Sequence, residues 1–225
     1  MRRRLTHLII LMLIVAALIP STPARAGENF VGHGSAAGAF FSSTQGNIVS
    51  EVRVGALKGY QHTPPEFKAA LLEIVVSLYQ YDRTICPSGT ECPAPILLAN
   101  GLIVLRAPSP GLLTNDSFEV RGDLEAATLH TTMQAWEEVS QSSIDVEIDL
   151  TWSAISDRTR DDAKSISKFL PGCLFVFDET IISRQATAVG SVVALGINFT
   201  PESSAEGQIS NGESHELAVV RGCEA

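Results

Sequence analysis

The sequence predicts an all-β protein, an antiparallel β-sandwich or barrel of about ten strands that disulfide bonds staple together. Three observations lead to this prediction. Apolar and polar residues alternate without interruption from Ile144 to Trp152, the pattern of a strand with one face in a core and the other in water. Similar segments recur at intervals of about 10 to 20 residues between Gly, Pro and Asn, with few credible helices. Four cysteines follow an N-terminal segment that is typical of exported proteins.

The N-terminal segment, residues 1–26, has the three parts of a secretory signal peptide. Three arginines follow Met1, an apolar run of twelve residues extends from Leu8 to Ile19, and small residues lead to Ala26. The run is shorter than the roughly 20 residues that cross a bilayer, although an uncleaved N-terminal anchor is the alternative. We therefore expect a secreted or periplasmic protein whose residues 27–225 form a single all-β domain, with no membrane span after signal cleavage.

The net charge of the chain limits the classes of molecule that we expect it to bind. Removing residues 1–26 takes away four arginines, which leaves 12 basic residues against 25 acidic ones and a net charge of −13. An acidic surface disfavours non-specific binding to nucleic acid and to anionic lipid. We expect no nucleic-acid partner, and the partner to be an extracellular ligand or protein whose identity the sequence does not reveal.

The cysteines are even in number, and in an exported chain this favours two disulfide bonds. We predict one bond across the turn-rich segment between Cys86 and Cys92, and a second bond that joins the last strand to the body of the domain through Cys173 and Cys223. Zinc is the competing interpretation of four cysteines, but the spacings lack paired C-x2-C units. We therefore predict no metal site.

The first half of the domain contains strands and glycine-rich segments. Three glycines within Phe30–Ser42 superficially resemble a dinucleotide fingerprint, but the strand, helix and distant acid that such a site needs are missing. We interpret this segment as a strand or bend. Asn47–Leu57 alternates and is predicted to be a strand, whereas the glycine and prolines of Lys58–Pro65 indicate a loop.

Phe67–Tyr81 supports two predictions. As a helix it follows a capping-box pair, Thr63 and Glu66, and has apolar residues along one face. As a strand it alternates from Leu72, and its β-branched and aromatic content favours this interpretation. We predict a hairpin with Ile96–Leu105 whose tip is the loop between the first two cysteines, with a short helix before the hairpin as the open alternative.

The second half predicts a regular hairpin. After a loop at Ala107–Asp116 and a short strand at Phe118–Gly122, Ala126–Trp136 alternates and is predicted to pair with Ile144–Trp152 through the turn at Glu137–Ser143. The charged segment Ser156–Ser167 is predicted to be a loop, an edge strand or a short helix. Two strands are predicted after it, at Cys173–Ser183 and Gln185–Leu195. A loop at Asn198–Gly212 and a closing strand at Glu216–Val220 complete the chain.

Two short motifs carry a resemblance. Asp149-Leu150-Thr151-Trp152 ends a strand, and Asn198-Phe199-Thr200-Pro201 forms a turn. On these motifs, residues 124–212 resemble a group of uncharacterised secreted bacterial all-β proteins with no assigned function. The resemblance covers under half of the chain. It implies an exported all-β domain and supplies no catalytic residue.

No motif predicts catalytic, cofactor-binding or metal-binding residues. The chain lacks a G-x-S-x-G elbow, an H-E-x-x-H helix and a P-loop. Asp145, Glu147 and Asp149 share one strand face about 6.6 to 7 Å apart; calcium is conceivable, but a straight strand lacks the wrapping loop of calcium sites, and a solvated acidic face is favoured. The histidines are far apart in sequence and are predicted to lie at the surface: His33, His62, His130 and His215.

The two tryptophans are predicted to differ. Trp152 continues the apolar register of its strand and is predicted to lie in the core, whereas Trp136 ends a polar face, where it is an exposed anchor or a cap. Aromatic rings on sheet faces also suggest stacking on sugars. The aromatic content of 6% is low for the aromatic girdles of an outer-membrane barrel.

The favoured function is binding or surface interaction without catalysis by an exported soluble β-domain. The alternatives are a barrel that holds a small apolar ligand in a cavity of some hundreds of cubic ångströms, and an extracellular hydrolase. Exposed apolar surface would favour the first function, an internal cavity the second, and a polar cleft with a nucleophile and base, or two carboxylates, the third.

Overall fold

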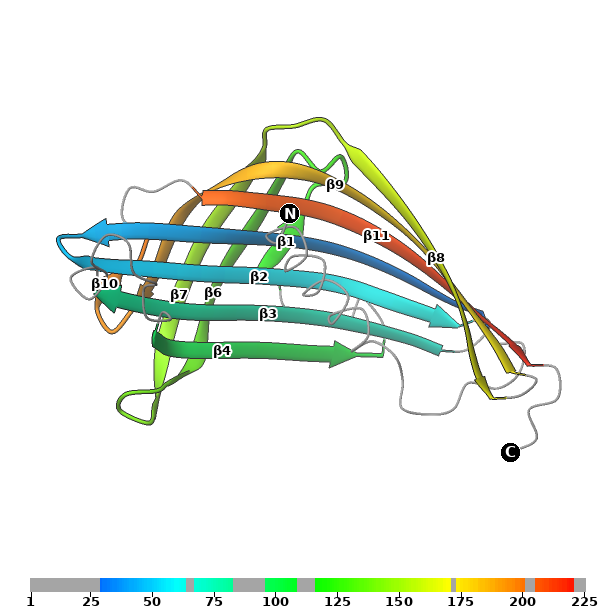
Figure 1. The fold of residues 1–225 in the computed structure, drawn as a ribbon, viewed down its shortest axis with the longest axis horizontal. Helices are drawn as coiled ribbons and strands as arrows, with labels where there is room; N and C mark the ends of the chain where they lie inside the picture. The colour runs from blue at the N-terminus through cyan, green and yellow to red at the C-terminus, as the bar shows by residue number, and fades with distance from the viewer. Residues whose placement is uncertain are drawn as a thin grey trace, which may run out of the picture.

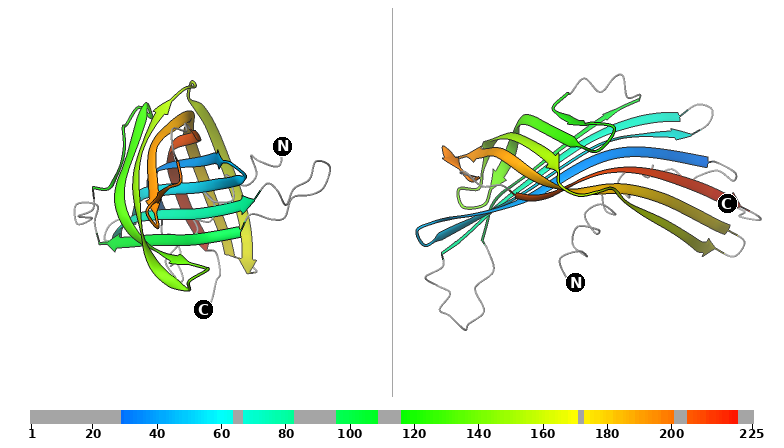
Figure 2. Two further views of the ribbon diagram at one scale, coloured as in Figure 1. Left: turned by 90° about the vertical axis from the view of Figure 1, so that its left-hand side faces the viewer. Right: turned by 90° about the horizontal axis from the view of Figure 1, so that it is seen from above.

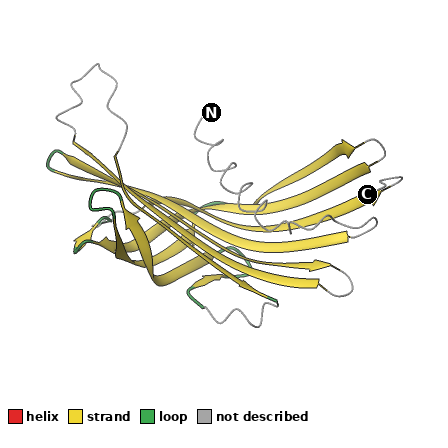
Figure 3. Cartoon of the chain, turned by 90° about the horizontal axis from the view of Figure 1, so that it is seen from below, coloured by secondary structure: helices red, strands yellow, loops and turns green. Residues whose placement is uncertain are grey.

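The computed structural model describes residues 29–63, 67–82, 96–108, 116–170, 173–200 and 205–220, which form one antiparallel sheet of eleven strands (Figure 1). Within these ranges the chain consists of strands and loops, with no helix (Figure 3). The predicted all-β antiparallel fold class is therefore confirmed. No helix of the described ranges has the length and apolar character to cross a membrane.

Most of the strands are long. Their bounds are β1 (Asn29–Gln45), β2 (Ile48–Thr63), β3 (Phe67–Asp82), β4 (Ile96–Ala107), β5 (Phe118–Val120), β6 (Ala126–Glu137), β7 (Ser142–Ala154), β8 (Thr159–Leu170), β9 (Cys173–Ala194), β10 (Ile197–Asn198) and β11 (Ala205–Val220).

The strand pairings connect into a closed circuit, β9–β11–β1–β2–β3–β4–β6–β7 and back to β9. The circuit closes at one end of the molecule only. β7 pairs with residues 186–194 of β9, whereas residues 173–183 of β9 pair with β8 instead. In the described register, β4 pairs with β6 at Ala99 and Asn100 only. We call the part completed by β6 and β7 the closed end, and the part flanked by β8 and the remainder of β4 the open end.

The figures show how the two ends differ. β1, β2, β3, β4 and β11 run side by side as a long curved sheet, and β6 and β7 cross it at a steep angle (Figure 1). Two further views show that β6 and β7 gather at one end of this sheet, while the long strands extend past them (Figure 2). The face of the long strands that is turned toward β6 and β7 is the inner face.

The hydrophobic core lies on the inner face at the closed end. Alternate residues of each long strand point into it, as in Val52 and Val54 of β2 or Ile74 and Val76 of β3, all at most 4% exposed. β6 and β7 supply the opposite side of the core through Leu129, Met133, Val146, Ile148 and Leu150. Burial of every second residue is what a half-buried strand requires, so the predicted faces of β6 and β7 are confirmed.

Trp152 joins β7 to the long sheet. Its side chain is fully buried, and its indole Nε1–H donates to the backbone carbonyl of Gly38 in β1 at 2.9 Å. A Cβ atom at Gly207 of β11 would lie 2.9 Å from Trp152 Cδ1 and 2.8 Å from the Gly38 carbonyl. The glycine at position 207 therefore makes room for the indole, and the predicted core position of Trp152 is confirmed.

Trp136 lies at the surface with 47% of its area exposed. Of the two predictions for this residue, the exposed position is the observed one. The Ala126–Trp136 and Ile144–Trp152 hairpin is also confirmed, with Leu129 opposite Leu150 in the register. Its turn is fixed by Glu137, whose carboxylate accepts the backbone N–H groups of Val139 at 2.8 Å and Ser140 at 2.6 Å.

Three predicted boundaries were wrong because they followed local composition. Lys58–Thr63 belongs to β2 rather than to a loop, residues 205–212 belong to β11 rather than to a loop, and β9 is continuous where two strands were predicted. β2 lies between β1 and β3, and β11 lies between β1 and β9. Because each is hydrogen-bonded on both sides, long-range pairing overrides the weak strand propensity of glycine and polar residues.

The two segments with alternative predictions are both strands. Phe67–Asp82 is β3 throughout and pairs with β4, so the hairpin is confirmed and the helix is excluded. The charged segment forms the edge strand β8, which is paired with β9 only.

The predicted disulfide bonds stay predictions. Cys86, Cys92 and Cys223 lie outside the described residues, as does the predicted signal peptide. Cys173 opens β9, opposite Val220 in the register of β11, and its side chain is not described.

Candidate binding cleft

A cleft of about 500 Å³ lies on the inner face toward the open end. Residues of β1, β2, β9 and β11 line it, and β5, which contacts β1 and β2, borders it on the other side. Five of its polar side chains come from β1, β2, β9 and β11, and one comes from the neighbouring β5: His33, Ser35, Lys58, Thr180, Asn211 and, on β5, Glu119. A volume of this size is within the range of about 300 to 1,000 Å³ that holds small ligands.

Strand register brings these side chains together. Lys58 of β2 is opposite Ser35 of β1, which in turn is opposite Asn211 of β11, and Asn211 is opposite Ile182 of β9. Directly opposed side chains in an antiparallel pair have Cβ atoms about 4.5 to 5.5 Å apart. The four residues therefore form a row across the floor of the cleft, at right angles to the strands.

The neighbouring row contains an aromatic pair. His33 is opposite Tyr60, and their ring centroids are 4.9 Å apart at an interplanar angle of 33°. Tyr60 keeps 39% of its area exposed, so part of its ring is available to an occupant of the cleft. Val120 of β5 adds apolar surface on the other side, whereas the side chain of Phe118 is buried in the core behind it.

Two polar groups of the floor lack a partner in the described part of the chain. The amide oxygen Oδ1 of Asn211 is buried and accepts no hydrogen bond there. Lys58 is half-buried, and no ion pair joins its ammonium group to a described residue. A buried acceptor without a protein partner is rare in native proteins.

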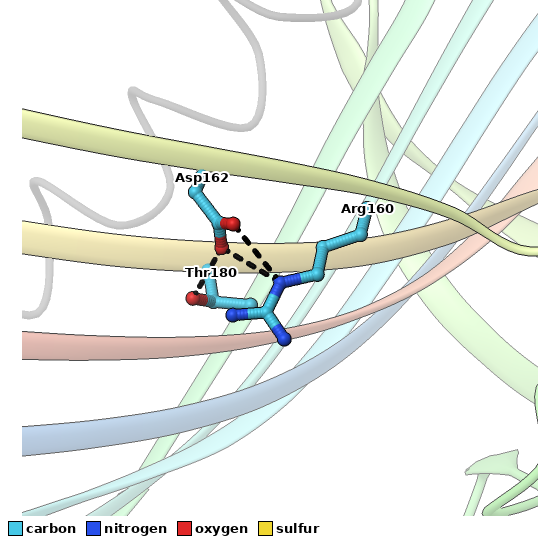
Figure 4. A network of polar contacts seen from close by, with 3 residues as sticks. All are labelled: Arg160, Asp162 and Thr180. Atoms are coloured by element: carbon cyan, nitrogen blue, oxygen red, sulfur yellow. Dashed lines mark hydrogen bonds and ion pairs between the residues drawn. The ribbon is translucent and has the colours of Figure 1, made fainter.

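The cations on the β8 side of the cleft are paired. Thr180, which lines the cleft, donates to Asp162 Oδ1 at 2.8 Å, and Arg160 Nε donates to the same carboxylate at 2.9 and 3.0 Å (Figure 4). The hydrogen bond from Thr180, followed by that from Arg160, lowers the pKa of Asp162. Lys164 lies 3.7 Å from Asp178. Lys58 differs from Arg160 and Lys164 in having no such carboxylate.

The three strand carboxylates are outside the cleft. Asp145, Glu147 and Asp149 are exposed on the outer face of β7, as predicted, and two of them have partners: Asp149 lies 2.8 Å from His130 Nδ1, and Asp145 accepts a hydrogen bond from Gln134. No group of three or more His, Cys, Asp or Glu side chains in the described ranges is arranged to hold a metal ion.

The histidines take different positions. His130 is at the surface, as predicted, with 58% of its side chain exposed. His33, also predicted at the surface, is instead partly buried in the cleft beside Tyr60. The side chains of His62 and His215 are outside the described part.

The sequence interpretation missed the cleft because it ended the second strand at Leu57. The inward alternation of Val52, Val54 and Ala56 continues at Lys58 and Tyr60. Extending the period of two by four residues would have placed both side chains on the inner face.

Comparisons with known proteins show no family. No family model matches the chain, and no curated protein matches it. Among solved structures, a candidate AttH protein from Nitrosomonas europaea matches 92% of this chain over 60% of its own length, with 9% identity and a TM-score of 0.33. The translocator domain of the autotransporter NalP from Neisseria meningitidis matches 96% of this chain over 97% of its own, with 11% identity and a TM-score of 0.20.

Proposed function

We propose that the protein is an exported, non-catalytic binding protein that holds a small molecule in the cleft between the inner face and β5. The signal-peptide pattern of residues 1–26 supports export. The closed circuit of strand pairings favours a barrel, closed at one end, over a sandwich. This architecture combines a packed core with an open mouth, where small barrels hold ligands.

One observation carries the proposal: the buried amide oxygen of Asn211 and the ammonium group of Lys58 lie in the same row, and neither has a partner among the described residues. Leaving a buried polar group without a hydrogen bond costs about 1 to 3 kcal/mol. A ligand that supplies the missing bonds recovers this cost on binding. The apolar surface of Ile182 and Val120 around these groups supplies the hydrophobic part of the affinity.

A thermal-shift screen of the purified protein against sugars, fatty acids, aromatic acids, neutral aromatics and divalent metals tests the proposal. A ligand at 100 times its Kd stabilises the folded state by about 2.7 kcal/mol. At about 2 to 4 °C per kcal/mol for a domain of this size, Tm rises by about 5 to 10 °C. No saturable shift with any small molecule would contradict the proposal and favour a macromolecular partner.

Two matched variants locate the binding site. Ser35→Trp places an indole on the floor of the cleft and is expected to abolish the saturable shift. Ser153→Trp makes the same change at an exposed outer position of β7 and is expected to retain it. Retention of the shift in Ser35→Trp would show that the ligand binds elsewhere.

A further inference from the structure

The cleft also indicates the chemical class of its occupant, and this inference rests on the proposed function. We propose that the ligand is an aromatic monocarboxylic acid with a hydrogen-bond donor at the opposite end of its ring. Its carboxylate pairs with Lys58, its ring lies beside Tyr60, and its donor reaches Asn211.

The charge of the ligand follows from Lys58. A cation that is partly removed from water without a counter-charge is unfavourable, and an anion brought into the cleft relieves that cost. The nearby cations Arg160 and Lys164 are already neutralised by Asp162 and Asp178. Lys58 is therefore the cation of the cleft wall that is free to pair with a ligand, within the part of the chain that the structure describes.

The charged residues that border the cleft also limit the number of negative charges on the ligand. The Glu119 carboxylate borders the cleft, but it is exposed. An exposed charge is screened by water and salt, so Glu119 leaves the attraction of Lys58 for a single carboxylate largely intact. A second negative group on the ligand would find no further Lys or Arg among the described residues that line the cleft. The cleft therefore favours a monoanion.

The aromatic body follows from the shape of the apolar wall. Tyr60 presents ring surface and is itself held in place by contact with His33. Aromatic rings pair favourably with other rings in offset or tilted arrangements, beyond what burial of area alone contributes. A planar ring between Tyr60 and the β5 residue Val120 uses this surface better than a flexible aliphatic chain.

The donor follows from the position of Asn211. Lys58 and Asn211 occupy the same row on β2 and β11, with β1 between them. Neighbouring strands are about 4.8 Å apart, so the two backbone positions are about 10 Å apart. Because the lysine side chain is long, one benzene ring with substituents at opposite ends suits this span. A hydroxyl at the far end would donate to Oδ1 after the Asn211 side chain turns this buried oxygen toward the cleft.

Isothermal titration with four probes tests the inference. The probes are 4-hydroxybenzoate, benzoate, 4-hydroxybenzyl alcohol and hexanoate, which separate the acid, the donor and the ring. We expect 4-hydroxybenzoate to bind tightest. Benzoate is expected to bind several-fold more weakly because it leaves Asn211 unpaired, and the neutral alcohol and the aliphatic acid are each expected to bind at least about tenfold more weakly.

Lys58→Met keeps the apolar stem of the side chain and removes its charge. It is expected to weaken 4-hydroxybenzoate binding at least about tenfold and to leave 4-hydroxybenzyl alcohol within about twofold. Lys164→Met is the matched control, because it removes a paired cation, and is expected to stay within about twofold of the wild type for both probes. Equal losses for acid and alcohol in Lys58→Met would overturn the carboxylate assignment.

The outcomes separate this inference from the proposed function. If the wild type binds a sugar or a neutral apolar molecule at the Ser35 site and none of the aromatic acids, the inference fails and the proposed function stands. If hexanoate binds as tightly as 4-hydroxybenzoate, the aromatic assignment is wrong. If no small molecule of either screen binds, both fail.

Discussion

Trp152→Phe is expected to destabilise the protein strongly, because this residue connects β7 to the long sheet. Its side chain is fully buried, and its N–H group donates to the Gly38 carbonyl at 2.9 Å. Phenylalanine retains an aromatic ring in the core but removes the donor and part of the indole. The substitution therefore tests the connection rather than the presence of an apolar group.

The expected cost has two parts. The phenyl ring lacks two carbon atoms of the indole, which at about 0.8 kcal/mol for each buried carbon gives about 1.6 kcal/mol. The Gly38 carbonyl loses its bond from the indole, at about 1 to 3 kcal/mol for a buried group left unpaired. The sum is about 2.6 to 4.6 kcal/mol in the free energy of unfolding, or about 5 to 18 °C in Tm for a domain of this size.

Urea unfolding, followed by circular dichroism, measures this free energy. Trp136→Phe is the matched control, because Trp136 is 47% exposed and the same substitution there is expected to change stability by no more than about 0.5 kcal/mol. That variant also leaves Trp152 as the single tryptophan, so its fluorescence reports on the core alone. Equal effects of the two substitutions, or a cost below about 1 kcal/mol at position 152, would refute the role assigned to Trp152.

Four further predictions concern single groups. Thr200→Val should cost about 1 to 3 kcal/mol, because the buried Thr200 hydroxyl accepts the N–H of Val192; Thr200→Ser should keep most of this stability in the same urea assay. Glu179 is buried without a described partner, and burial raises its pKa above the ordinary 4.5, so its ionisation costs stability as pH rises through the folded pKa. Glu179→Gln should therefore be more stable than the wild type at pH 8 and equal to it near pH 4. Equal Tm values of the two proteins at pH 8 would contradict this prediction. Hydrogen bonds from Ser140 and Val139 lower the pKa of Glu137 below 4.5. The wild type should therefore have a higher Tm than Glu137→Gln at pH 7, and this difference should disappear as pH falls through the folded pKa. A Tm difference that does not depend on pH would contradict the assignment of these hydrogen bonds. Denatured, unreduced protein from which residues 1–26 have been removed should react with no thiol reagent, and two or more reactive cysteines would exclude the predicted pairs: Cys86, Cys92, Cys173 and Cys223.

The part of the fold that could be predicted is the part where local pattern and burial coincide. β6 and β7 each have one face in the core and one in water, so their alternation alone places Leu129 and Leu150 inside and Asp149 outside. The chain connection between them is short, which makes antiparallel pairing the simplest arrangement. Both the strands and their relation to each other could therefore be inferred from residues 126–154.

The length of β2 and β11 could not be predicted locally. Residues 205–212 include polar side chains and two glycines, and in isolation they resemble a loop. They form a strand because β1 and β9 supply hydrogen bonds on both sides. Gly207 illustrates the reason for one of these glycines, since a side chain there would collide with Trp152, which is 55 residues earlier in the chain. Such a requirement is visible only once the strands are assembled.

The candidate site was missed for the same physical reason. Ser35, Lys58 and Asn211 are ordinary surface residue types, and no motif joins them. Register across β2, β1 and β11 makes them neighbours, and the absence of a described partner for the Asn211 oxygen distinguishes them from other polar side chains. A single sequence contains the alternation that turns Lys58 inward, but it does not contain the pairing that places Asn211 beside it.

If the proposed function is correct, the same strands serve stability at one end and recognition at the other. On the inner face of β2, the residues change from Val52, Val54 and Ala56 to Lys58 and Tyr60 at the position where β6 and β7 no longer complete the circuit. Apolar residues occupy the inner positions that protein covers, and polar and aromatic residues occupy those that border the cleft. Because the two sets belong to the same continuous strands, the packed closed end helps to fix the positions of the cleft residues, and a smaller buried cluster of Ala36, Leu57 and Leu71 lies on the opposite face of these strands. This arrangement lets the open end keep unpartnered polar groups that a packed core would not tolerate.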